Sequence, residues 1–298
     1  METINNNVII VKKKLSGKQL AVRIALYAFL IALGVVFMFP YFFMITRGLM
    51  TPTRFKHPAA MWILPKKWMI SNIVTAFSQG GYGLPLLQSV WIAIVNCAGT
   101  AFASALSAYA FVRLNWIGKK FMFSFMMVTS MLPGVVTQVP LYVMYNTFGI
   151  LNTALPLFLP NMFFAGAMNI FLTRQFMIAE PKEMYESAMI DGAGPFRSFL
   201  SISLPLSKTI IIYIAVNVFM GSWGDYYGPS IFMKRVEANQ RPFAFALYYN
   251  LTNDVSGSNA HPEYMFSACI VLSLVPMLCF AFFQKYLVQG IATAGIKG

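Results

Sequence analysis

The sequence predicts an all-α membrane protein with six transmembrane helices. Of its 298 residues, 58% are hydrophobic and only 10% are charged, and the mean hydropathy is +0.65. A soluble domain carries about 25% charged residues, and one membrane span needs about 20 mostly apolar residues. The chain contains several such runs, separated by short polar segments. We therefore expect the chain to lie in a lipid bilayer.

The formal net charge of +13 also fits a nucleic-acid-binding protein. The basic residues, however, stand in short clusters beside apolar runs. Lys and Arg in such places set membrane topology and contact anionic lipid headgroups. We therefore expect lipid contacts and no nucleic-acid partner.

The first spans follow from charge-free stretches. A basic leader of 23 residues precedes residues 24–46, which contain no charge and predict the first span. A cleaved signal peptide would have an apolar region of only about 7–15 residues. The run ends in Pro40-Tyr41-Phe42-Phe43 and not in a small-x-small cleavage site, so we expect an uncleaved first helix. Residues 47–83, rich in Pro, Trp and basic residues, predict a loop at the membrane interface, and residues 84–112 predict the second span.

The next uncharged stretch, residues 121–173, is too long for one helix. Residues 146–152 (NTFGILN) interrupt it with residues that favour turns. The interruption predicts a third span at residues 121–145 and a fourth at residues 153–173.

The last part of the chain predicts a fifth span at residues 209–224, a polar loop at residues 234–263 and a sixth span at residues 264–283. With the N-terminus inside, eight of the 22 Lys and Arg residues fall outside and 14 fall inside, so both termini are expected in the cytoplasm. The predicted parts are an N-terminal cytoplasmic segment (1–23), a transmembrane domain (24–288) and a cytoplasmic tail (289–298).

A polar segment, residues 180–208, separates the fourth and fifth spans. Pro181 suits the first position of a helix, and Gly192 and Gly194 predict the end of that helix, because glycine adopts the left-handed conformation of a C-cap. Pro195 then opens a second short helix. Both helices carry an apolar face that needs a partner. These faces consist of Met184, Tyr185, Ala188 and Met189 on the first helix and Phe196, Phe199 and Leu200 on the second.

Three short motifs make this segment similar to the EAA loop of ABC importer permeases. They are Glu186-Ser187-Ala188, Asp191-Gly192-Ala193 and Leu204-Pro205. Ser187 stands where that family usually has alanine. In the family, the loop is a cytoplasmic coupling helix that docks in a cleft on an ATPase subunit; an ordinary amphipathic surface loop is the alternative. The resemblance implies that the coupling residues are Glu186, Ser187, Ala188, Asp191, Gly192, Ala193, Phe196 and Pro205.

Two further stretches, residues 223–226 (WGDY) and residues 283–298, resemble carbohydrate importer permeases of the maltose-transporter type. In that family the tail reaches the ATPase dimer interface; a frayed basic terminus is the alternative. The residues that would take this role are Gly295, Ile296, Lys297 and Gly298. The family's counterpart of the outer loop at residues 250–262 enters the cleft of the solute-binding protein, and a solvated connector explains the loop equally well.

The resemblance implies a permease that forms half of a pathway for a sugar or oligosaccharide in the cell membrane of a prokaryote. The implied partners are a second homologous permease, two copies of an ABC ATPase and an extracytoplasmic sugar-binding protein. The chain has no G-x-x-x-x-G-K-[ST] motif, so ATP and Mg are expected on the partner ATPase, with no cofactor or enzyme site here. The alternatives are an ABC permease for a non-sugar solute and a secondary transporter. The latter should contain internal repeats and intramembrane ionisable residues.

Polar residues within spans are candidate substrate contacts, because burying them in a membrane is unfavourable. Asp225 is taken as the only acid near a span. The other candidates are Gln138, Asn161, Asn217, Trp223 and Tyr226, with Asn96 and Asn169 also considered. Each has a competing role as an interhelical hydrogen-bond partner, which membrane bundles use widely. The two histidines and three cysteines lack the spacing of metal ligands, so no metal site is expected.

Overall fold

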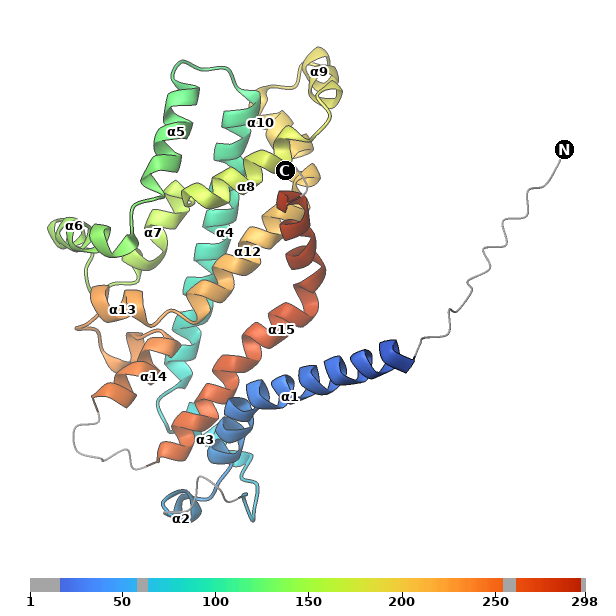
Figure 1. Cartoon of the computed structure of the whole chain (residues 1–298). Helices are drawn as coiled ribbons and strands as arrows, with labels where there is room; N and C mark the ends of the chain where they lie inside the picture. Colours follow the sequence, from blue (N-terminus) through green and yellow to red (C-terminus); the bar gives the residue numbers. More distant parts are fainter. Residues whose placement is uncertain (1–16, 58–63, 254–260, 296–298) are drawn as a thin grey trace.

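The computed structural model describes residues 17–57, 64–253 and 261–295, with side chains through residue 287, and every regular element in these ranges is helical (Figure 1). The helices are α1 (Gly17–Gly48), α2 (Pro52–Phe55), α3 (Ser71–Ser78), α4 (Gly83–Arg113), α5 (Lys119–Thr129), α6 (Gly134–Thr147), α7 (Leu155–Phe164), α8 (Ala167–Ile178), α9 (Glu183–Ile190), α10 (Pro195–Ser198), α11 (Leu204–Leu206), α12 (Lys208–Trp223), α13 (Tyr227–Phe232), α14 (Phe243–Thr252) and α15 (Pro262–Gly295). A π-helical turn (Phe199–Ser203) and a 3₁₀ turn (Ala238–Gln240) complete the set. The predicted all-α fold is confirmed.

Four helical segments in the described part of the chain are long and apolar enough to cross a membrane: α1, α4, α7 with α8, and α15. Two more pass this test only as bent pairs. α5 and α6 meet at 103°, and the segment that begins with α10 meets α12 at 79°. The number of spans is therefore four, or six if each bent pair is one span. The predicted six corresponds to the upper count.

The central helix of the bundle is α4, against which α12, α7 and α8 pack (Figure 1). Its buried face consists largely of small residues, among them Ala93, Thr100, Ala101, Ser104, Ala105 and Ala108. Small side chains allow helix backbones to approach closely in a membrane. At Gly99, an added Cβ would lie 2.3 Å from Cγ of Met162 on α7. Close packing of α4 on α7 therefore depends on glycine at this position.

Helix α1 leaves the bundle and contacts it mainly near its C-terminal end, where it packs on α15 (Figure 1). There Ser267 Oγ donates a hydrogen bond to the Gly48 carbonyl at 2.6 Å, and the Phe43 and Phe266 rings lie 6.1 Å apart. The predicted first span, residues 24–46, lies within α1, which continues through Pro40 to Gly48. Transmembrane helices tolerate an internal proline because neighbouring groups satisfy the freed carbonyl.

The predicted third span, residues 121–145, is not one straight helix. The chain forms α5, turns at residues 130–133 and continues as α6. Pro133 explains this break, because the residue before a proline is disfavoured in the α conformation. The turn predicted at residues 146–152 is confirmed, with Gly149 and Asn152 at positive φ.

The remaining span boundaries shift modestly. The fourth predicted span corresponds to α7 and α8, which are joined where Ala165 and Gly166 both have positive φ. α12 ends at Trp223 and does not continue past Asp225. α15 is longer than the predicted sixth span and reaches Gly295, so the part of the predicted tail before residue 296 is helical.

The prediction of a polar loop at residues 234–263 is wrong, because this stretch contains α14. Its first five residues (FAFAL) are all buried. The Phe243 ring lies 6.2 Å from the rings of Tyr82 and Trp223, and its N–H donates to Ser89 Oγ at 2.8 Å. This short apolar run therefore packs against α4 and α12 instead of lying in solvent.

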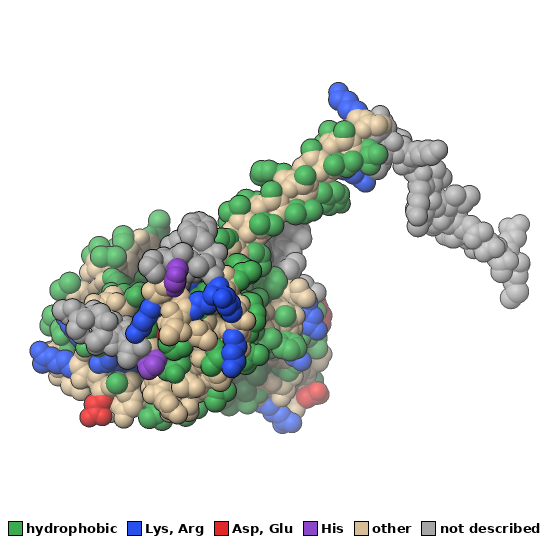
Figure 2. Space-filling model, turned by 90° about the horizontal axis from the view of Figure 1, so that it is seen from below, with side chains coloured by type: hydrophobic (Ala, Val, Ile, Leu, Met, Phe, Trp, Pro, Cys, Tyr) green, Lys and Arg blue, Asp and Glu red, His purple; other side chains and the backbone are tan. Residues whose placement is uncertain are grey.

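Basic side chains gather at the end of the bundle that carries α2 and α14, opposite to α9. Figure 2 views this end and shows several Lys and Arg side chains with few acidic ones. The exposed basic residues in the segments beside α2 and before α14 are Lys56, Lys66, Lys67, Lys234 and Arg235. These basic residues lie at the end that the predicted topology has outside the cell.

Candidate functional site

The segment after α8 folds as two short helices around a glycine turn. α9 ends at Ile190 with Asp191 as its C-cap, and Gly192 has a φ of +77°, in the left-handed region that favours glycine. The next N–H, that of Ala193, donates to the Ala188 carbonyl at 2.8 Å and closes the helix end. The turn geometry therefore requires glycine at position 192.

Two details of this segment differ from the prediction. α9 begins at Glu183 and not at Pro181, because the first helical hydrogen bond runs from the Glu186 N–H to the Lys182 carbonyl. Gly194 has a φ of −68° and a ψ of 164°, which is extended rather than left-handed. Its carbonyl accepts the Ser198 N–H at 3.0 Å, so Gly194 begins α10 and does not end α9.

The predicted apolar faces divide into inner and outer residues. Tyr185 and Phe199 are buried, and the Phe199 ring lies 5.4 Å from that of Tyr109 and 6.0 Å from that of Phe102, both on α4. The outer residues form an exposed apolar surface that we call the coupling surface; it consists of Met184, Met189, Ile190, Phe196 and Leu200. Ile190 is 86% exposed. One side of the segment is therefore anchored, and the other presents apolar side chains.

The other predicted coupling residues surround this surface. Glu186, Ser187 and Asp191 are exposed, and Ala188 and Ala193 are half-buried. Pro205 lies exposed in α11, after the π-helical turn. The structure thus gathers the residues of the three motifs in one segment between α8 and α12.

The C-terminal end of α15 lies at the same end of the bundle as α9 and α10 (Figure 1). Gly295 is the last residue of α15. Ile296, Lys297 and Gly298 of the predicted tail lie outside the described residues, as do residues 254–260 of the predicted outer loop.

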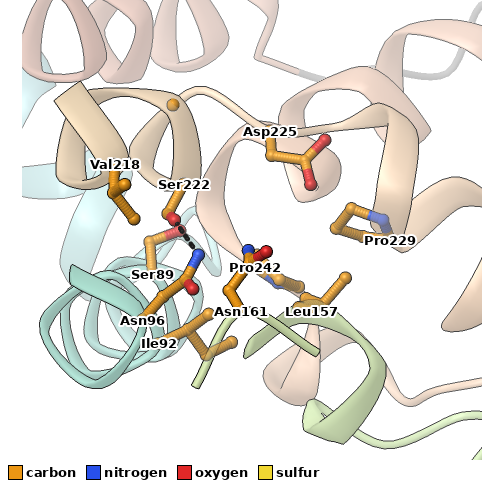
Figure 3. Close-up of a pocket in the computed structure, with 11 residues that line it drawn as sticks. Ser89, Ile92, Asn96, Leu157, Asn161, Val218, Ser222, Asp225, Pro229 and Pro242 are labelled. Atoms are coloured by element: carbon orange, nitrogen blue, oxygen red, sulfur yellow. Dashed lines mark hydrogen bonds between the residues drawn. The ribbon is translucent and has the colours of Figure 1, made fainter. Parts of the chain in front are cut away.

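A second candidate site is a cavity of about 270 Å³ between α4, α7, α12 and the chain around α13 (Figure 3). Its polar lining residues are Ser89, Asn96, Asn161, Ser222 and Asp225. Asn96 Nδ2 donates to Ser222 Oγ at 2.6 Å, and Asn96 Oδ1 accepts from Thr100 Oγ1 at 3.3 Å. Asp225 Oδ1 accepts the N–H of Gly228, in the first turn of α13, at 3.0 Å. None of the lining residues is Lys or Arg.

The remaining predicted pathway residues lie elsewhere. Asn217 Nδ2 donates to the Tyr213 carbonyl of its own helix at 2.8 Å. Trp223 is buried, and its Nε1 donates to the Leu272 carbonyl at 2.9 Å. Their contacts are hydrogen bonds within the protein.

Two more predicted residues pair with aromatic residues near α13. Gln138 Oε1 accepts a hydrogen bond from Tyr227 OH at 3.0 Å. The Tyr226 ring lies 4.8 Å from that of Tyr248, and both rings are partly exposed. Asn169, also considered from the sequence, donates to the Ala165 carbonyl at 2.8 Å.

Sequence reasoning missed several polar residues at both sites. Ser89 and Ser222 line the cavity, and single serines within apolar runs carry no distinguishing signal. The prediction that Asp225 is the only acid near a span is wrong, because Glu180 lies two residues after the end of α8 and is buried. An acid within two residues of an apolar helix was the available signal.

The chain is similar to known transport proteins over most of its length. It is 31% identical over 215 residues to the galactooligosaccharides transport system permease protein GanQ of Bacillus subtilis, covering 71% of this chain and 73% of that protein. It is 29% identical over 272 residues to the sn-glycerol-3-phosphate transport system permease protein UgpE of Brucella melitensis, covering 88% and 93%.

A solved structure shares the fold: a bacterial ABC transporter involved in the import of the acidic polysaccharide alginate. The TM-score is 0.75 at 14% sequence identity, and the match covers 92% of this chain and 99% of the other. Residues 98–293, more than half of the chain, match the family of binding-protein-dependent transport system inner membrane components. The chain is a multi-pass bacterial membrane protein and belongs to this family.

Proposed function

We propose that this chain is a permease subunit of an ATP-driven importer for a sugar or oligosaccharide, and that the α9–α11 segment couples it to an ATPase. The exposed coupling surface is the observation that carries the coupling role. Membership of the binding-protein-dependent family supports the transport role, and relatives named for galactooligosaccharides and α-glucosides support a carbohydrate. The UgpE relatives, named for sn-glycerol-3-phosphate, keep a non-sugar solute as the alternative.

The coupling surface suits a protein groove better than lipid or water. Its apolar side chains stand on a segment that also exposes Glu186 and Asp191, and charged residues beside them disfavour burial in a bilayer. An amphipathic helix with exposed apolar anchors is a common ligand for a hydrophobic groove. Methionine side chains adapt readily to such a partner. In this proposal the groove belongs to an ATPase subunit in the cytoplasm.

The position of the C-terminal end of α15 supports a cytoplasmic position for the C-terminus. α9 and the C-terminal end of α15 lie at one end of the bundle, so the tail residues Gly295 to Gly298 would meet the same ATPase (Figure 1). The opposite end would face the solute-binding protein. Its exposed basic residues suit a partner with an acidic surface, because opposite charges increase association rates.

The cavity supports the carbohydrate assignment. Hydroxyl, amide and carboxylate groups bind sugar hydroxyls, and Asn161 and Asp225 would supply two of them. The exposed Tyr226–Tyr248 pair offers an aromatic surface next to Asp225. The cavity has no lining Lys or Arg to attract a phosphate or carboxylate group, which favours a neutral solute.

In the complete transporter, this chain would pair with a second permease, two ATPase copies and an extracytoplasmic binding protein. ATP and Mg would bind to the ATPases. Their closure would displace α9 and open the pathway alternately to each side of the membrane.

Affinity purification of tagged protein from native membranes tests this proposal. We expect co-purification of an ATPase, a second permease and a binding protein, and ATP hydrolysis that the loaded binding protein stimulates. The ligand of that binding protein would identify the solute. A chain that purifies alone or as a homo-oligomer, without any ATPase, would contradict the proposal.

A further inference from the structure

Beneath α9 lies a buried polar network that is separate from the cavity. Its centre is Glu180, which exposes 7% of its surface. Oε1 accepts a hydrogen bond from Ser207 Oγ at 2.6 Å. Oε2 accepts one from the Tyr185 hydroxyl and one from Arg113 Nη2 at 3.4 Å. Both carboxylate oxygens therefore have donors.

The network joins parts of the chain that lie far apart in sequence. Arg113 is the last residue of α4, Tyr185 belongs to α9, and Ser207 directly precedes α12. Arg113 Nη2 also donates to the carbonyls of Met177, at 3.1 Å, and Glu180, at 3.3 Å. One carboxylate thus connects α9 to the two central helices of the bundle.

The chemistry of the network favours a positioning role over a purely stabilising one. A buried ion pair often stabilises a fold no more than apolar residues of similar volume would, and its best-attested use is to fix register. The ion pair between Arg113 and Glu180 is almost fully buried, with side-chain exposures of 11% and 4%. Ser203 Oγ lies 2.6 Å from the Tyr185 hydroxyl and adds a further bond. The hydroxyls of Tyr185 and Ser207 and Nη2 of Arg113 each have a directional partner. Among the described residues Nε of Arg113 is buried without one, so the other bonds define the geometry of α9 relative to α4 and α12.

We propose that Glu180 is a positioning residue that fastens α9 to α4 and α12, so that displacement of α9 moves these helices and reshapes the cavity between them. This inference rests on the proposed coupling function. Asn96 on α4 and Ser222 on α12 both line the cavity and bond to each other. A relative movement of the two helices therefore changes the cavity directly. Without the network, α9 would still bind its partner but would transmit its movement poorly.

The test uses the complete transporter in proteoliposomes and measures the amount of solute imported for each ATP hydrolysed. The variants are Glu180→Gln, Tyr185→Phe and Ser207→Ala. Glu237→Gln makes the same chemical change as Glu180→Gln at an exposed site after α13 and is the matched control. We expect the ratio to fall at least about tenfold in the network variants, the effect of losing one hydrogen bond to a charged group. We expect the amount of co-purified ATPase to stay normal and the control to keep the original ratio.

An unchanged ratio in both Tyr185→Phe and Ser207→Ala, in normally assembled complexes, would overturn the inference. These two variants decide the matter if Glu180→Gln does not assemble, because each retains the carboxylate. A Phe196→Glu variant separates this inference from the proposed function. If Phe196→Glu abolishes ATPase binding while the network variants keep a normal ratio, only the positioning role fails. If Phe196→Glu binds ATPase and transports normally, the coupling function itself fails, and the inference with it.

Discussion

The guanidinium carbon of Arg113 lies 3.7 Å from the centroid of the Tyr185 ring. The last residue of α4 thus packs on the face of the inward-pointing aromatic residue of α9. A desolvated cation–π contact contributes about 2 kcal/mol. Phe199 adds a second, apolar anchor through its contact with Tyr109. The α9–α11 segment is therefore held on its inner side by α4, while its outer side carries the coupling surface.

The turn at Gly192 should be sensitive to substitution. Gly192→Pro should leave the protein inserted but uncouple transport from ATP hydrolysis, because proline fixes φ near −65° and the native φ is +77°. Uptake and ATPase activity in proteoliposomes measure this. Gly194→Ala is the matched control, since Gly194 has a φ of −68° and open space at its Cβ. Normal uptake by Gly192→Pro would contradict the coupling role of this turn.

The coupling surface should be needed for assembly with the ATPase. Phe196 is 59% exposed, and Phe196→Glu would place a charge in the proposed groove. Burying this charge in an apolar groove should weaken binding by more than about 1.4 kcal/mol, which is a tenfold loss of affinity. We therefore expect at least a tenfold loss of co-purified ATPase. Leu251→Glu adds the same charge at an exposed apolar position on α14, at the far end of the bundle, and should retain the ATPase.

Phe199 should govern stability instead of partner binding. Its side chain is fully buried against α4, so Phe199→Ala should lower the free energy of unfolding by about 3–5 kcal/mol. Thermal unfolding in detergent measures this change. Phe196→Ala, three residues away and exposed, should unfold near the temperature of the unmodified protein. Equal stability of the two variants would show that Phe199 is not an anchor.

The network beneath α9 should respond to alkaline pH. Burial and the hydrogen bond to Glu180 raise the pKa of Tyr185 from 10.0 to about 12. The folded state thus favours the neutral phenol of Tyr185. The stability that this neutral phenol contributes is fully present below pH 10 and is lost as the pH rises towards 12. A spectroscopic titration should assign one late tyrosine to this site. Tyr185→Phe should remove that late step, and a titration identical to that of the unmodified protein would exclude Tyr185 as its source.

The cavity should affect transport without affecting assembly. Asn161→Leu removes a polar lining group and should reduce uptake severalfold, while the complex assembles normally. Asn217→Leu is the control, because Asn217 bonds only to its own helix in the contacts described and lies outside the cavity lining. Equal uptake by the two variants would argue against a substrate pathway through the cavity.

Much of the fold could be predicted because long apolar runs and basic clusters are local signals. The same counting could not distinguish a straight span from the bent α5–α6 pair, since both have the same hydropathy. Pro133 was the only local sign of the bend. α14 was missed because five buried residues stand between polar neighbours, and their burial depends on tertiary contacts with Tyr82 and Trp223.

The candidate sites were predictable to different degrees. Fixed spacing in the Glu186–Pro205 segment indicated the coupling turn, whereas the cavity arises from residues on separate helices. Asn96 and Ser222 are 126 positions apart, and nothing in either local sequence indicates the pairing. The hydrogen-bond partners of Glu180 were hidden for the same reason.

The contact between Gly48 and Ser267 joins the first long helix of the described chain to the last. During synthesis, α1 leaves the ribosome long before α15 exists, and its backbone hydrogen bonds are complete without any neighbour. α1 can therefore enter the bilayer early and remain in contact with lipid until α15 is made. An added Cβ at Gly48 would lie 2.8 Å from the Ser267 backbone nitrogen, so the two helices meet only in a close-fitting arrangement. Among the described helices, α15 is therefore made after α1 and packs against a helix that is already formed.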